Sequence, residues 1–348
     1  MELQEKKSLQ FELWEECGPF RCTYCYLGKN NIKTSTYLKI DAIQKALDFL
    51  NDEEKMKEYN VVSYIGGEFF QGQLNTPEVK SKFHELMYKT AELQISGKIK
   101  EFWLMCTLNH GEQKDLYEVL DLLKARYTEA GQPELMHQIW IVTSYDTIGR
   151  FHTQKMHDTW DYHMQNLHKV YPELQFNVCT ILTGDLVKKY INDEWSFEEF
   201  IKKYHTSMFF KQPNPGAIHQ EQLTHPQGTK EGFMEAKQIM ETKLPGFFPK
   251  REDFLAFLIK FKAEYPTMYD KLFNIQYRAD DLYRNYNDEE EGHRMQYNHR
   301  EKDLKAEVPE ESIKYNPIND CGHLLNYAAY IDADDCMICD RELIRSQF

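Results

Sequence analysis

The chain has 348 residues, of which 41% are hydrophobic, and a formal net charge of −14 at pH 7. This length allows one large α/β domain with an appendage, or two ordinary domains. The acidic balance argues against a broadly basic nucleic-acid groove. No stretch reaches the roughly 18 apolar residues of a membrane span, and the first residues lack the apolar run of a signal peptide. We therefore expect a cytoplasmic protein with no membrane partner, in which thiols stay reduced.

Strand-like and helix-like patterns alternate through residues 1–215. Short apolar runs typical of strands lie at 9–14, 60–65, 101–107, 138–144, 174–182 and 207–212. Between them, apolar residues recur at helical spacing in the segments 37–51, 77–94, 112–130 and 156–171. Repeated β–α units predict an α/β fold with a parallel sheet and right-handed crossovers, and we expect a partial (β/α)6 TIM-like barrel. The loops after the strands would then form one functional face.

The pattern changes after residue 215. Helical segments are predicted near 229–243 and 251–272, followed by a highly charged stretch with few apolar residues. We interpret residues 216–305 as a helical extension with an exposed linker. Residues 306–348 contain three further cysteines and are expected to form a small C-terminal module.

Three cysteines follow the first predicted strand, in the segment ECGPFRCTYC. Cys17, Cys22 and Cys25 are separated by gaps of four and two residues. A disulfide, a zinc site and an iron–sulfur cluster are the three alternatives for such a group. A reducing compartment disfavours the disulfide, and no nearby histidine or acid is suited to complete a tetrahedral zinc site. Three thiolates would leave one corner of a cubane cluster open to another ligand.

Polar or glycine residues also follow two later strands. Gly66, Gly67 and Glu68 come directly after the second predicted strand. Glycines permit close backbone approach, and a carboxylate can accept hydrogen bonds from an ammonium group. Ser144, Asp146 and Arg150 lie at the end of the fourth predicted strand, where the alternative role of Asp146 is to cap a helix.

The cysteine loop and the GGE segment, one β–α unit apart, together resemble the radical S-adenosylmethionine superfamily. The usual family spacing is C-x3-C-x2-C, so this chain departs from it by one residue in the first gap. The resemblance implies that Cys17, Cys22 and Cys25 ligate a [4Fe-4S] cluster and that S-adenosylmethionine binds its fourth iron.

The same resemblance assigns roles to the other strand-end residues. Gly66, Gly67 and Glu68 would hold the amino group of the cosubstrate, and Tyr24 would lie beside its adenine or else fill the loop. Ser144, Asp146 and Arg150 would contact the ribose and the carboxylate. The implied chemistry is one-electron cleavage of S-adenosylmethionine to a 5′-deoxyadenosyl radical, which abstracts hydrogen from a substrate. A reductant protein of the flavodoxin or ferredoxin type is the implied partner.

The C-terminal cysteines form a second candidate metal site. Cys336 and Cys339 have the C-x2-C spacing of a metal-binding knuckle, and Cys321 and His323 precede them. One interpretation is structural Zn²⁺ with His323 as the fourth ligand. The other is a second iron–sulfur cluster, because SPASM or twitch extensions are frequent in the superfamily. Unligated thiols are the third alternative.

Two substrate classes and one non-enzymatic function remain open at this point. The compact predicted barrel and the short C-terminal module favour modification of a nucleobase, a nucleotide or a similar small polar group. Maturation of a ribosomal peptide, using the C-terminal cysteines, is the alternative enzyme function. A zinc-stabilised interaction protein would explain both cysteine groups, but it gives no reason for the position of the GGE segment.

Overall fold

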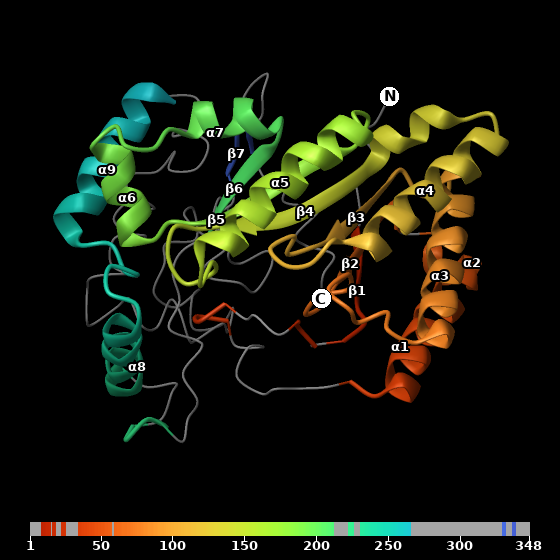
Figure 1. The fold of residues 1–348 in the computed structure, drawn as a ribbon, viewed down its shortest axis with the longest axis horizontal. Coiled ribbons are helices and arrows are strands. Elements are labelled where there is room, and N and C mark those ends of the chain that lie inside the picture. Colours follow the sequence, from red (N-terminus) through yellow and green to blue (C-terminus); the bar gives the residue numbers. More distant parts are fainter. Residues whose placement is uncertain are drawn as a thin grey trace.

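The computed structural model describes residues 8–14, 16–18, 22–25, 34–57, 59–211, 222–225, 230–265, 329–331 and 336–338. It is a mixed α/β structure in which helices form an arc around a parallel sheet (Figure 1). In the described part of the chain, no helix combines the length and apolar character needed to cross a bilayer.

Six parallel strands lie side by side in the order of the sequence, each pairing with the next. They are β1 (Ser8–Glu12), β2 (Val61–Ile65), β3 (Glu101–Met105), β4 (Ile139–Tyr145), β5 (Gln175–Ile181) and β6 (Ser207–Lys211). The predicted parallel sheet is confirmed, and each strand lies within two residues of its predicted bounds. Because the crossovers of such units are right-handed, consecutive strand order places the connecting helices on one face of the sheet.

The helices follow the apolar periodicity of the sequence. They are α1 (Thr36–Asn51), α2 (Glu53–Met56), α3 (Pro77–Ile95), α4 (Lys114–Glu129), α5 (Gln154–Val170), α6 (Gly184–Ile191), α7 (Phe197–Tyr204), α8 (Lys230–Lys243) and α9 (Arg251–Glu264), with a 3₁₀ helix η2 (Pro133–Gln138). The side chains of Ser35, Thr76 and Thr153 cap α1, α3 and α5 by accepting a hydrogen bond from the third helical N–H. The short helices α6 and α7 were not predicted, because their eight residues are fewer than the roughly 11–18 over which helical periodicity is read.

The core lies between the sheet and these helices. Val61, Val62 and Tyr64 of β2 are completely buried, as are Phe83 of α3 and Trp160 of α5. Burial on both faces is typical of a parallel sheet, and it explains why the strand sequences are apolar runs rather than alternating patterns.

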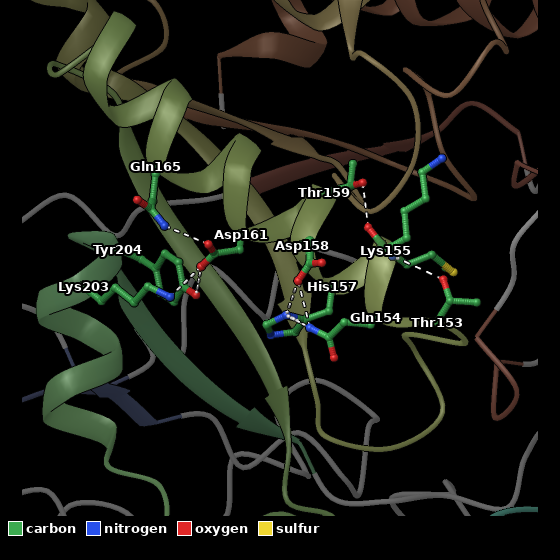
Figure 2. Close-up of polar contacts among 11 residues, drawn as sticks. Thr153, Gln154, Lys155, His157, Asp158, Thr159, Asp161, Gln165, Lys203 and Tyr204 are labelled. Carbon is green, nitrogen blue, oxygen red and sulfur yellow. Dashed lines mark hydrogen bonds and ion pairs between the residues drawn. The ribbon is translucent and has the colours of Figure 1, made fainter.

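Asp161 connects α5 to α7 at the surface (Figure 2). Its carboxylate accepts hydrogen bonds from Lys203 Nζ at 2.6 Å, from the Tyr204 hydroxyl and from Gln165 Nε2 at 2.8 Å. Burial acts to raise the pKa of Asp161, but these donors outweigh it and lower the pKa overall. The lowered pKa means that the folded state favours the ionised carboxylate.

Asp161→Asn is therefore expected to destabilise the protein in a pH-dependent way. The stability that Asp161 contributes is fully present above its unfolded pKa of about 3.9 and is lost as the pH falls through the lower folded pKa. Urea unfolding at several pH values should show a difference from wild type that shrinks on acidification. Asp158→Asn on the exposed face of the same helix serves as the matched control. A pH-independent difference would contradict the role of this charge.

Two short strands extend the sheet beyond β6. β7 (Ala329–Ile331) pairs antiparallel with β6, and β8 (Cys336–Ile338) pairs antiparallel with β7. The register places Cys336 opposite Ile331. Residues 329–331 and 336–338 thus lie in the same sheet as β6.

Candidate functional site at the carboxyl ends of the strands

The start of the cysteine loop is bonded to the GGE segment through backbone atoms. The Gly67 N–H donates to the Trp14 carbonyl at 2.8 Å, and the Glu68 N–H donates to the Glu16 carbonyl at 2.9 Å. The Trp14 indole N–H also donates to the Glu68 carbonyl at 2.8 Å. The ends of β1 and β2 are parallel neighbours, so these bonds continue the sheet into the two loops.

Gly66 is required here for a steric reason. Its φ angle is +154°, and a Cβ atom at this position would lie 2.2 Å from the Trp14 carbonyl oxygen. Because Gly66 has no side chain, its backbone can lie against the Trp14 carbonyl, at the start of the cysteine loop.

Gly66→Ala is expected to destabilise the fold by more than the roughly 1–3 kcal/mol that unfavourable backbone strain costs by itself. The added methyl group must displace a backbone carbonyl, which cannot rotate away as a flexible side chain would. Gly97→Ala is the matched control, because Gly97 also has a positive φ, +72°, but a Cβ atom there would meet nothing within 4 Å. Thermal unfolding compares the two; equal losses would contradict the steric explanation.

The Glu68 carboxylate is buried and ties two loops together. Oε1 accepts from the Phe69 and Phe70 N–H groups at 2.8 and 2.9 Å, and Oε2 accepts from the Thr107 N–H at 2.5 Å. Burial raises the pKa of Glu68, and hydrogen bonds from Thr107, Phe70 and Phe69 oppose that shift. With 1% of its surface exposed, Glu68 joins the loops after β2 and β3. Its contact with the amino group of a cosubstrate stays a prediction.

Gln71 extends this connection, although no sequence motif includes it. Its amide Nε2 donates to the Thr107 hydroxyl and to Asn109 Oδ1, the latter at 2.7 Å. A Cβ atom on Gly18 would lie 2.4 Å from Gln71 Oε1, so Gln71 also packs against the cysteine loop. The only sequence signal was a polar residue three positions after Glu68.

The three cysteines of the loop are all partly exposed, whereas Cys106 and Cys179 are buried in the sheet region. The Cys25 N–H donates to the Cys22 carbonyl at 3.0 Å, which forms a turn between them. Burial raises the pKa of the Cys22 thiol to about 11, and the nearby Arg150 guanidinium partly opposes this shift. Binding of a metal at Cys22 would therefore have to release a proton.

A second set of contacts joins the cysteine loop to the loop after β4. The Thr23 N–H donates to the Gly149 carbonyl at 2.8 Å, and the Tyr24 hydroxyl donates to Asp146. Asp146 also accepts from the backbone N–H of Arg150 at 3.1 Å and from its Nε at 3.3 Å. Helix α5 begins later and is capped by Thr153, so Asp146 does not cap the helix that follows it. Ser144 lies on β4 and is partly exposed.

The turn between α8 and α9 covers this region from another side. The Tyr24 ring stacks on Phe247, with ring centroids 5.3 Å apart and an interplanar angle of 24°. The carbonyls of Phe247 and Gly246 accept from the N–H groups of Gly184 and Asp185, both at 3.0 Å. Sequence reasoning missed Phe247, because buried aromatic residues in a short turn have no periodic signature.

The donor set of the loop is compatible with a cubane cluster. Among the described side chains, no group of three or more His, Cys, Asp or Glu is arranged to hold a single metal ion. A cubane differs from a single ion because each of its cysteines binds a separate iron, so the three sulfurs need not meet at one point. Three cysteines on one short loop supply the thiolate ligands that such a cluster takes.

A groove with a volume of about 550 Å³ lies elsewhere, along α5 and between it, the loop after β3 and the start of α4. His163 lines it and donates from Nε2 to the Gly111 carbonyl at 2.9 Å. This bond fixes the neutral tautomer with its proton on Nε2, and within the described chain Nδ1 is buried without a hydrogen-bond partner. None of the predicted site residues lines this groove.

The predicted C-terminal metal ligands fall almost entirely outside the described part of the chain. Cys321, His323 and Cys339 lie outside the described residues, and only the backbone of Cys336 is described. Comparisons of the chain with protein-family models, curated proteins and solved structures found no match.

Proposed function

We propose that the chain is a radical S-adenosylmethionine enzyme in which Cys17, Cys22 and Cys25 hold a [4Fe-4S] cluster. The observation that supports this most is the bonding of the cysteine loop to the GGE segment, through Gly67 to Trp14 and Glu68 to Glu16. The two motifs that carry the resemblance come from different β–α units. Two motifs that occur by chance do not have to lie next to each other in the fold. Two motifs that bind one cosubstrate do have to be adjacent.

The architecture supports the proposal through the order of the strands. With the helices on one face of six consecutive parallel strands, the other face would line the packed inside of a partial barrel. The carboxyl ends of the strands then form the functional face, as they do in barrels. Thr107, Asp146 and Thr183 follow β3, β4 and β5 on that face.

When bound, a reduced [4Fe-4S] cluster supplies the electron that cleaves the sulfonium of S-adenosylmethionine. The residues of this chain have separate tasks. Glu68 and Gln71 hold the loops after β2 and β3 in place. The Phe247 ring stacks on Tyr24 of the cysteine loop and covers that part of the loop. Gly66 and Gly67 would hold the amino group of the cosubstrate through backbone atoms.

For the substrate, we propose a nucleobase, a nucleotide or a similar small polar group. The support is the compactness of the sheet, in which the consecutive strands β1 to β6 pair directly with one another and bring the loops at their carboxyl ends together at one edge. Maturation of a ribosomal peptide is the second candidate. A flavodoxin-type or ferredoxin-type protein would supply the electron.

Anaerobic reconstitution with iron and sulfide tests the proposed function. We expect the protein to bind about four irons per chain at the loop site and to form 5′-deoxyadenosine from S-adenosylmethionine under reduction. Deuterium transfer from labelled nucleotides or peptides into 5′-deoxyadenosine identifies the substrate class. Colourless protein that retains zinc and never takes up iron would contradict the proposal and favour the zinc-stabilised interaction protein.

A further inference from the structure

We propose that Asp146 and Arg150 form a buried ion pair that sets the charge beside Cys22 and thereby the reduction potential of the cluster. The inference rests on the proposed function, because it concerns the group that the cysteine loop would hold. It gives the two residues a role apart from direct contact with a cosubstrate.

The ion pair lies beside the turn that links Cys22 to Cys25, because both residues of that turn are bonded to the segment 146–150. Thr23 donates its N–H to the carbonyl of Gly149, the residue directly before Arg150. Tyr24 donates its hydroxyl to the Asp146 carboxylate itself. Both residues of the turn that lie between the two cysteines are thus bonded to the segment that carries the ion pair.

The pair is shielded from solvent. Asp146 is 1% exposed and Arg150 is 8% exposed, so water and salt screen their charges much less than at the surface. Arg150 Nε lies 3.3 Å from Asp146 Oδ2. Asp146 accepts three hydrogen bonds, from Tyr24 and from two N–H groups of Arg150, which is the pattern expected of an ionised carboxylate.

Fold stability does not by itself account for this pair. Burying two charges carries a large desolvation cost, and apolar residues of similar volume often serve as well or better. Asp146 does not cap α5, because Thr153 does. A buried charge pair beside candidate metal ligands therefore indicates a functional role.

The charges of Asp146 and Arg150 are expected to shift the reduction potential of the cluster in opposite directions. One-electron reduction adds negative charge to a cluster, so a nearby cation favours the reduced state and a nearby anion disfavours it. In the intact pair the two effects largely cancel. Loss of the Asp146 charge leaves the Arg150 cation uncompensated, and loss of the Arg150 charge leaves the Asp146 anion.

The test is a reductive titration of reconstituted full-length protein, followed by electron paramagnetic resonance without cosubstrate. Asp146→Asn is expected to raise the midpoint potential, and Arg150→Met is expected to lower it. The double variant should return towards the wild-type value, and Arg150→Lys, which keeps the cation, should stay near it. Lys45→Met, on a side chain 75% exposed in α1, is the control for an uninvolved charge.

The outcomes separate this inference from the proposed function. Shifts of the same sign in Asp146→Asn and Arg150→Met, or shifts no larger than that of Lys45→Met, would overturn the ion-pair inference and leave the proposed function standing. A wild-type protein that binds no cluster would overturn both. If Arg150→Met retains no cluster, Arg150→Gln removes the same charge while keeping a polar side chain, and its potential must also fall.

Discussion

Cys22→Ala is expected to abolish both the iron–sulfur cluster and the cleavage of S-adenosylmethionine. Cys22 and Cys25 form one turn of the loop, and a cubane left with two cysteine ligands would be poorly held. The iron-to-protein ratio, the visible absorption of the reconstituted protein and the yield of 5′-deoxyadenosine measure the effect. The same losses are expected for Cys17→Ala and Cys25→Ala.

The matched control for this experiment is Cys106→Ala. Cys106 is 4% exposed and comes directly after β3, where its N–H donates to the Val142 carbonyl at 2.9 Å. Its replacement removes a thiol without touching the loop, so iron content should stay at the wild-type level. Retained cosubstrate cleavage in Cys22→Ala would show that the loop does not hold the reactive cluster.

Glu68→Gln is expected to have the second-largest effect. It should lower the stability of the protein and weaken the binding of the cosubstrate. A glutamine oxygen can still accept from Phe69 and Phe70, but its NH₂ group would then face the Thr107 N–H. A buried donor left without an acceptor costs about 1–3 kcal/mol. Because the loops after β2 and β3 would separate, we also expect weaker binding of S-adenosylmethionine while the cluster still assembles.

Two measurements distinguish these effects. Urea unfolding of the apoprotein reports the stability loss, and a direct binding titration of the reconstituted protein reports the affinity. Glu112→Gln, an exposed glutamate in the loop before α4, is the control and should change stability by no more than about 0.5 kcal/mol. A stable Glu68→Gln protein with weakened binding would instead indicate direct contact of the carboxylate with the cosubstrate. Unchanged stability and affinity would remove Glu68 from both roles.

The local patterns of the sequence were sufficient to predict the six parallel strands and the long helices. A run such as residues 61–65 is apolar because both faces of a parallel strand are covered, and the period of α3 or α5 extends over several turns. The short helices α6 and α7 were missed because two turns are shorter than the segment over which helical periodicity is read. The strands β7 and β8 were missed because three residues form a strand only when a neighbour pairs with them.

The sequence also determined which residues stand at the strand ends, since the order of residues along the chain fixes the loop that each strand leads into. It could not determine the contacts of those residues. Contact of Glu68 with a cosubstrate stays a prediction, and no sequence pattern indicated that its carboxylate accepts hydrogen bonds from the backbone of two loops. Asp146 was a candidate ribose contact or helix cap, and it pairs with Arg150 and Tyr24.

Only the tertiary structure decided these partners, because each depends on segments that are far apart in the chain. Tyr24 contacts Asp146 and Phe247, which are both far from it along the chain. These contacts can form only once the fold has brought the three segments together. A buried carboxylate accepts hydrogen bonds from whichever donors the packing places around it. Burying it without a partner costs more free energy than any single hydrogen bond contributes. The sequence thus determined the elements and the order of the chemical groups along the chain, and long-range packing decided which of those groups face one another.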